Sequence, residues 1–208
     1  MNLINQDFAN NIPKTFMTEN VSLFLYSLLK STRPHSIIEI GAGYSTLFLS
    51  EAIRDIKKED ISHISNDKLI ENYKSYCGDN YDPFFVVIDR CQQQKYENAH
   101  FVNMDAKEYL NKTDHSFDLV WLDFGPTSTK EYHYYFDTFL ERLNPGGFIV
   151  IHSTATNCIA RIFLTELKAE IKQRNIELLT ILEPHKKEQN SFTVIKKEID
   201  YPIYTFYP

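Results

Sequence analysis

The chain has 208 residues, of which 43% are hydrophobic, and its formal net charge at pH 7 is −6. This length predicts one domain with one sizeable core. The acidic charge argues against nucleic acid and anionic membranes as partners, and no segment has the roughly 18 uninterrupted apolar residues of a membrane helix. The three cysteines lack the spacing of a disulfide framework or a zinc site. Because residues 1–10 also lack a secretory signal, we expect a cytoplasmic protein.

Segments with strand and helix patterns alternate along the chain. In chain order we expect a helix at 18–31, a strand at 36–40, a helix at 46–56, strands at 84–89, 100–105 and 117–123, a helix at 129–142, a strand at 148–152, a helix at 156–174, and strands at 176–183 and 191–197. Thr18 is the expected N-cap of the first helix. Residues 57–83 are expected to form a polar insertion with a helix at 68–76, either a lid over the site or a solvated excursion.

This alternation predicts an α/β fold in which a doubly wound, mostly parallel sheet of seven strands has helices on both faces. The turn at 184–190 is too short for a helical crossover, so the last two strands should pair as an antiparallel C-terminal hairpin. We expect a single domain over 1–208 that begins with a helical segment at 1–35. Its aromatic tail at 198–208 should lie extended, either back over the sheet edge, over the substrate mouth, or in a homodimer interface.

Residues 36–46 have the pattern of a buried strand that runs into a ligand-binding turn. Gly41 and Gly43 would let the backbone turn sharply and approach a ligand closely, and the free N–H groups of the next helix would point at that ligand. Thr46 stands where a dinucleotide fingerprint needs its third glycine. The acceptor-only carboxylate of Glu39 favours a cationic or donor-rich ligand over a pyrophosphate. A strand–turn–helix unit without a ligand is the alternative.

The sequence E-I-G-A-G-Y-S at 39–45 resembles the first motif of the class I S-adenosylmethionine-dependent methyltransferases. In that family the turn holds the methionine end of the cofactor, whose ammonium and sulfonium charges suit the Glu39 carboxylate. The resemblance covers residues 18–197, is also clear at 143–151, and implies a Rossmann-like methyltransferase fold. It implies S-adenosylmethionine as co-substrate, bound by Glu39, Gly41, Ala42, Gly43, Tyr44, Ser45, Asp89, Asp105, Ala106 and Asp123.

Polar side chains end several of the expected strands, where ligands of open parallel sheets bind. In the resemblance Asp89 accepts both ribose hydroxyls, and Asp105, with Ala106, matches the position that hydrogen-bonds the adenine amino group. A competing register makes residues 61–65 the second strand and Asp67 the ribose acid.

Asp123 and His152 are the catalytic candidates. Asp123 follows the fourth expected strand and would face the transferable methyl group, while His152, at the end of the fifth, has an ordinary pKa near neutrality and would be the base. Methyl transfer is an in-line SN2 displacement, for which the protein aligns the nucleophile and removes its proton. A purely structural role for His152 is the alternative. Tyr132, His133 and Tyr135 either line an acceptor pocket or belong to the core.

The layout is also similar to that of the small-molecule O-methyltransferases related to the catechol type. Those bind a divalent cation through an Asp after the fourth strand and an Asp-Asn pair after the fifth. The corresponding pair here is His152-Ser153, which lacks a hard carboxylate ligand, so we predict an enzyme without a metal. It would methylate an oxygen or nitrogen atom of a small-molecule acceptor. A non-catalytic cofactor-binding or interaction module of the same fold and a protein or RNA methyltransferase are the alternatives.

Overall fold

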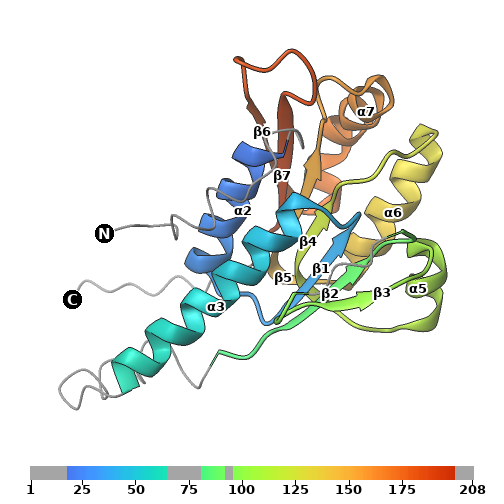
Figure 1. Cartoon of the computed structure of the whole chain (residues 1–208). Helices are drawn as coiled ribbons and strands as arrows, with labels where there is room; N and C mark the ends of the chain where they lie inside the picture. The colour runs from blue at the N-terminus through green and yellow to red at the C-terminus, as the bar shows by residue number, and fades with distance from the viewer. Residues whose placement is uncertain (1–17, 65–80, 92–95, 200–208) are drawn as a thin grey trace, which may run out of the picture.

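The computed structural model describes residues 18–64, 81–91 and 96–199 (Figure 1). Its elements in chain order are α2 (Glu19–Thr32), β1 (Ser36–Ile40), α3 (Tyr44–Ile64), β2 (Phe84–Ile88), β3 (His100–Val102), α5 (Ala106–Lys112), β4 (Phe117–Leu122), α6 (Thr129–Arg142), β5 (Leu143–His152), α7 (Cys158–Arg174), β6 (Ile176–Leu182) and β7 (Ser191–Lys197). This order confirms the predicted alternation of strands and helices. Within these ranges no helix is long and apolar enough to cross a membrane.

The strands form one seven-stranded sheet in the order β3-β2-β1-β4-β5-β7-β6. Strands β1 to β5 are parallel, and β7 is antiparallel to both β5 and β6. The doubly wound, mostly parallel sheet with a C-terminal antiparallel hairpin is therefore confirmed, with β6 at the edge. The strand order reverses direction between the neighbouring strands β1 and β4. Ligands of such sheets bind at the carboxyl ends of the strands beside this switch point.

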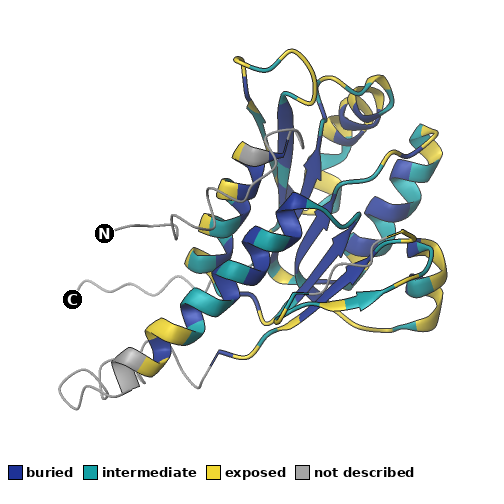
Figure 2. Ribbon diagram, viewed as in Figure 1, coloured by how far each residue is buried: buried dark blue, intermediate teal, exposed yellow. Residues whose placement is uncertain are grey.

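Helices cover both faces of the sheet, and the buried residues gather in the strands and on the inner sides of these helices (Figure 2). Apolar residues of α2 and α3 pack with Ile37 of β1 on one face, and those of α5, α6 and α7 pack with Ile38 on the other. Because successive side chains of a strand point to opposite faces, Glu39 lies on the α3 face and Ile40 on the α6 face. The polar residues at the strand ends are thus divided between two sides of the sheet.

Helix α3 is longer than the helix predicted at 46–56, since it begins at Tyr44 and ends at Ile64. It continues because Ile56 and Asp60 stay on its buried side, where the Asp60 carboxylate accepts a hydrogen bond of 2.5 Å from the Arg33 guanidinium. Residues 57–64 therefore belong to a helix and not to a polar insertion. The alternative second strand at 61–65 is wrong, because residues 61–64 are helical and β2 pairs with β1 instead.

Asp67 and the predicted helix at 68–76 lie outside the described residues, as do residues 1–17 and 200–208. Strand β5 begins at Leu143, five residues before the predicted start, because Leu143 pairs with Phe117 across a register shift in the β4–β5 ladder. Thr18 is the N-cap residue of α2, as predicted. Its carbonyl accepts a hydrogen bond of 2.8 Å from the Ser22 N–H, but its side chain makes no cap hydrogen bond.

Candidate active site

The turn at Gly41 lies where three strands end. The Gly41 N–H donates to the Ile88 carbonyl of β2 (3.0 Å), and the Asp123 N–H donates to the Ile40 carbonyl (3.0 Å). Gly41 has a φ of +91°, and a Cβ at this position would lie 2.1 Å from the Asp123 carbonyl oxygen. Only glycine suits this conformation and this close approach. The structure shows no such requirement at Gly43. A Cβ there would meet no described atom within 4 Å, and the φ of Gly43 is not positive.

A cavity of about 460 Å³ lies beside this turn, at the carboxyl ends of β1 and β2. Its lining comes from the turn, from the loops after β2, β3 and β4, and from the start of α6. The lining residues are Ile40, Gly41, Ile88, Asp89, Arg90, Cys91, Met104, Asp105, Ala106, Phe124, Gly125, Thr127, Glu131 and Tyr135. Four of the residues predicted to bind a cofactor, Gly41, Asp89, Asp105 and Ala106, are therefore together at one cavity. Apolar walls with a few converging polar groups are typical of small-molecule sites.

Asp89 fastens the loop after β2 to the glycine turn. Its Oδ2 accepts a hydrogen bond from the Ala42 N–H (3.0 Å), and its Oδ1 accepts one from the Cys91 N–H (2.6 Å). Both of these contacts come from backbone N–H groups, which hold the side chain against the two loops. Asp89 also lines the cavity, so its carboxylate lies at the wall that a bound molecule would contact.

Asp105 is the N-cap of α5. Its Oδ1 accepts hydrogen bonds from the Lys107 N–H (2.8 Å) and the Glu108 N–H (3.3 Å), while its Oδ2 pairs with the Arg90 guanidinium. The Arg90 hydrogen bond is the main reason that the pKa of Asp105 is lowered from its ordinary value, and the two backbone bonds add to it. Asp105 therefore reaches the cavity as a charged group that already has partners.

Glu39 is fully buried on the other face of the sheet, below the first turn of α3. The Trp121 indole N–H donates to the Ser45 hydroxyl (3.0 Å), and this hydroxyl donates to Glu39 Oε1 (2.5 Å). Burial raises the pKa of Glu39 to about 8, and the nearby carboxylates of Asp123 and Asp89 act in the same direction. Glu39 and Ser45 were expected to contact a cofactor, but neither is among the residues that line the cavity.

Tyr44, another expected cofactor residue, is also buried, with its ring 4.9 Å from that of Phe48. Tyr44 and Gly43 do not line the cavity either. The Gly43 N–H donates to Thr46 Oγ1 (3.0 Å), which closes the turn at the start of α3. The turn is thus held by its own side chains and by Asp89.

Asp123 and His152, the two catalytic candidates, contact each other. His152 Nδ1 lies 2.8 Å from Asp123 Oδ1, and the imidazole ring lies 5.7 Å from the Trp121 ring. A carboxylate can only accept, so Nδ1 carries the proton and Nε2 is left as an acceptor. His152 is buried, and its Nε2 has no hydrogen-bond partner in the described part of the chain. Neither Asp123 nor His152 is among the residues that line the cavity, but Asp123 directly precedes the lining residue Phe124.

The three aromatic candidates of α6 have different environments. Tyr132 is buried and stacks on Phe163 of α7, with ring centroids 5.2 Å apart, so it belongs to the core. His133 Nε2 lies 2.7 Å from the Glu166 carboxylate of α7. Tyr135 is the one of the three that lines the cavity. Tyr132 therefore belongs to the core, Tyr135 belongs to the core and also lines the cavity, and His133 is in neither set.

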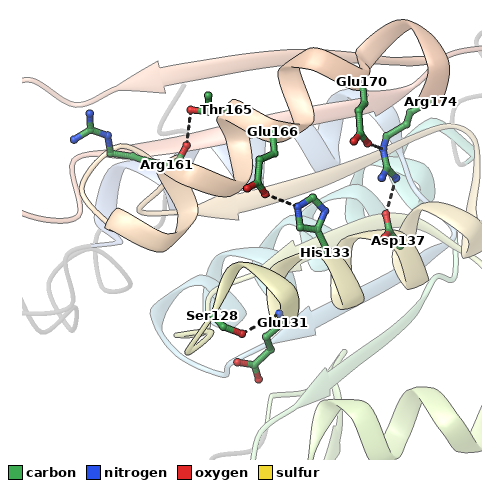
Figure 3. Close-up of polar contacts among 9 residues, drawn as sticks. All are labelled: Ser128, Glu131, His133, Asp137, Arg161, Thr165, Glu166, Glu170 and Arg174. Carbon is green, nitrogen blue, oxygen red and sulfur yellow. Dashed lines mark hydrogen bonds and ion pairs between the residues drawn. The ribbon is translucent and has the colours of Figure 1, made fainter.

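Polar contacts join α6 to α7 (Figure 3). Besides the pair of His133 and Glu166, the Arg174 guanidinium contacts Asp137 at 2.5 Å and Glu170 at 2.6 Å. The Ser128 hydroxyl caps α6 by accepting a hydrogen bond from the Glu131 N–H. Together these contacts hold the first turns of α6, which supply two of the residues of the cavity wall.

Comparison with known families identifies residues 38–154, more than half of the chain, as a match to a family model described as a methyltransferase domain. The chain belongs to the class I S-adenosylmethionine-dependent methyltransferases. The matched region runs from β1 through the glycine turn and the cavity to the residues just after His152. A comparison of this methyltransferase with curated proteins gave no match.

Solved structures share the fold of this methyltransferase. An O-methyltransferase from Bacillus cereus in complex with SAH has a TM-score of 0.63 at 15% identity, over 95% of this chain and 94% of that chain. A putative O-methyltransferase from Klebsiella pneumoniae has a TM-score of 0.62 at 15% identity, over 92% and 86% of the two chains. The O-methyltransferase TomG from Streptomyces achromogenes, involved in tomaymycin synthesis and solved with SAM, has a TM-score of 0.56 at 16% identity, over 94% and 91%. The Rossmann-like methyltransferase fold is confirmed.

Several residues at the site of this methyltransferase were not found from its sequence. Arg90 pairs with Asp105, and Phe124 faces Tyr135 with ring centroids 4.7 Å apart. Both follow a predicted site acid directly in the sequence, so the residue after each strand-end carboxylate was the available signal. Trp121 was not among the predicted site residues. Its signal was the indole N–H, which needs a hydrogen-bond acceptor when it is buried.

Proposed function

We propose that this methyltransferase transfers a methyl group from S-adenosylmethionine to an oxygen or nitrogen atom of a small-molecule acceptor, without a metal. The observation that carries this proposal is the contact of His152 with Asp123 beside the cavity. A buried imidazole that is oriented through Nδ1 and has no described hydrogen-bond partner at Nε2 has an atom that a general base requires. The likeness in fold to several O-methyltransferases supports a small acceptor and favours oxygen.

The cavity would hold the adenosine half of the co-substrate. Asp89 lines the cavity and is oriented by the Ala42 and Cys91 N–H groups, and it would accept the ribose hydroxyls. Asp105 and Ala106 would lie at the adenine, and the rings of Phe124 and Tyr135 give that part of the cavity an aromatic wall. The Gly41 turn and Glu39 would lie under the methionine half, where a carboxylate suits an ammonium group.

For the methyl transfer itself, the chain aligns the reacting atoms and takes up a proton. His152 Nε2 would accept the proton of the acceptor as the acceptor oxygen or nitrogen bonds to the methyl carbon and the carbon–sulfur bond breaks. Asp123 would hold the imidazole in the required tautomer and stabilise its protonated form, so it acts as a positioning residue for His152. A well-placed general base contributes roughly 10²–10⁴-fold to the rate of such a step.

The residues at the end of β5 do not fit the divalent cation of the catechol type. Asp123 Oδ1 is already bonded to His152, and Ser153 stands where an Asn oxygen would be required. Hard cations take six or more oxygen ligands, and within the described residues no group of three or more His, Cys, Asp or Glu side chains is placed to hold a metal ion. We therefore derive no step through a metal.

The test uses S-adenosylmethionine with a deuterated methyl group, incubated with the enzyme and an extract of small metabolites. We expect mass spectrometry to find a labelled product, with a yield that is unchanged by a chelator and by added magnesium. Loss of the product on chelation and its return with magnesium would contradict the metal-free mechanism. Calorimetric binding of the cofactor without any labelled product, from this extract or from protein and RNA fractions, would favour the non-catalytic alternative.

A further inference from the structure

Glu39 is a carboxyl group buried in the middle of the sheet. It lies between Val87 of β2 and Trp121 of β4 in the strand register, and its exposed fraction is 0%. No Lys, Arg or His of the described residues pairs with it, and its Oε2 has no hydrogen-bond partner among them. A buried carboxylate without a cation is costly, so such a group takes up a proton instead.

The hydrogen bonds around Glu39 connect it to Trp121 through Ser45. The Trp121 indole N–H is a donor only, so the Ser45 hydroxyl accepts from it and keeps one proton and one further lone pair. This hydroxyl donates to Glu39 Oε1 when the carboxyl group is ionised, and it is able to accept from Oε1 when the group is protonated. Ser45 therefore suits both forms of Glu39, whereas Oε2 is buried and has no hydrogen-bond partner among the described residues.

The charged and titratable groups that face Glu39 come from four elements. Asp89 after β2 and Asp123 after β4 repel its ionised form, and Asp123 is itself paired with His152 of β5. Tyr96, before β3, has its own pKa raised mainly by burial and also by the nearby charge of Glu39. The hydroxyls of Ser45 and Thr46 in α3 act in the opposite direction, but burial outweighs them and raises the pKa of Glu39 to about 8.

We infer that Glu39 is protonated in the free enzyme and gives up this proton when the ammonium group of the cofactor's methionine end binds, with Ser45 and Trp121 as the residues that position it. The proton goes to solvent, and the ammonium becomes the cation that the buried carboxylate lacks. This inference rests on the proposed function, because it needs the cofactor to bind at the glycine turn. Cofactor binding would then become tighter as the pH rises, up to about the pKa of the free Glu39.

The test is calorimetry of S-adenosylhomocysteine binding to the full chain at pH 7, in buffers of different ionisation enthalpy. We expect release of about 0.9 proton, since a group with a pKa of about 8 is about nine-tenths protonated at pH 7. The Kd should fall about tenfold between pH 6 and pH 7 and level off above pH 8. Binding without proton release would overturn the inference. An absence of binding would instead contradict the proposed function, so the two failures are distinguishable.

The Glu39→Gln variant should bind with much less proton release, and the difference from the wild type removes any titration of the ligand's own amine. Glu183→Gln is the matched control, because Glu183 is also a buried acid but lies in the β6–β7 hairpin, beside Lys186. It should release the wild-type number of protons. If Glu39→Gln fails to fold, infrared difference spectra of the wild type decide the matter. A protonated carboxyl band should disappear on binding, and its persistence would overturn the inference.

Ser45 provides a readout that a merely structural role would not change. Its hydrogen bond stabilises the ionised form of Glu39, so Ser45→Ala should shift the pH at which Kd levels off to a higher value. A loss of thermal stability with no shift in this pH would show that Ser45 has only a structural role. Trp121→Phe, which removes the donor to Ser45 but keeps an aromatic ring, should shift it less.

Discussion

The polar groups on the two sides of the glycine turn differ in how fully they are satisfied. Toward α5 and α6, the carboxylates of Asp89 and Asp105 accept hydrogen bonds from backbone N–H groups and from Arg90. Toward α3, Glu39 and His152 are buried, and each has one atom, Oε2 or Nε2, without a hydrogen-bond partner among the described residues. The carboxylates on the first side thus have hydrogen-bond partners within the protein, whereas the second side has two buried atoms that lack them.

This difference suggests that one side of the site shapes the cavity and that the other interacts with the reacting groups. A buried polar atom without a partner costs about 1–3 kcal/mol, so proteins keep few of them unless a ligand or a reaction step uses them. The satisfied acids give the cavity a fixed shape and charge before a ligand arrives. In the proposed mechanism, the unsatisfied atoms would match the charge of the ammonium group and accept the proton of the acceptor. We therefore expect substitutions on the two sides to affect different measurements.

The largest effect is expected at His152. His152→Gln keeps a donor for Asp123 but removes the base, so kcat should fall by roughly 10²–10⁴-fold while the Kd of S-adenosylhomocysteine stays nearly constant. The measurement is the turnover of the acceptor found by deuterium labelling, together with calorimetry of the cofactor. His133→Gln is the control, because His133 contacts Glu166 on the outer side of α6 and its loss should leave kcat unchanged. An equal loss in both variants would contradict the role of His152.

The next effect concerns the turn that joins the two sides. Gly41→Ala should lower the free energy of unfolding by about 2–4 kcal/mol, because the new Cβ would meet the Asp123 carbonyl and the φ is positive. Gly43→Ala, where space is open, should change it by no more than about 0.5 kcal/mol. Urea denaturation of both variants measures this difference. Equal losses would show that the turn needs both glycines for folding.

The fold was predictable because its signals are local. The isoleucine run at 37–40 and the apolar run at 84–88 are short buried strands that helices separate, and such an alternation allows few other sheets. The length of α3 was not predictable in this way. Its last turns carry mostly polar residues, and they are held by the contact of Asp60 with Arg33, the residue that follows α2. This partner is distant in sequence.

The site was predictable only as a set of strand ends. Asp89 and Asp105 follow parallel strands, so their place at one cavity follows from the topology. The contact of Asp123 with His152 depends also on the neighbouring positions of β4 and β5, whose register pairs Leu122 with Ile151. The sequence contains both residues but not this pairing. Likewise, nothing local indicates that Asp105 pairs with Arg90, because exposed arginines have many acids within reach.

The smallest expected effect is on stability, and it concerns Asp105 and Arg90 beside the cavity. Asp105→Ala removes the N-cap of α5 and should cost about 1 kcal/mol of unfolding free energy, while Asp105→Asn, which still caps, should cost less. Arg90→Ala should lower the unfolding midpoint slightly, and less than Asp105→Ala, because its pair with Asp105 lowers the pKa of Asp105 but is exposed to solvent.

The pH dependence of the same variants identifies the cause. Because the pKa of Asp105 is lowered in the folded protein, its ionic contribution is present above the ordinary Asp value of about 3.9 and is lost as the pH falls through the folded value. The difference between the wild type and Asp105→Asn should therefore shrink in acid, as measured by urea denaturation from pH 7 downward. A difference that stays constant with pH would mean that backbone capping, and not charge, accounts for the stability of this side.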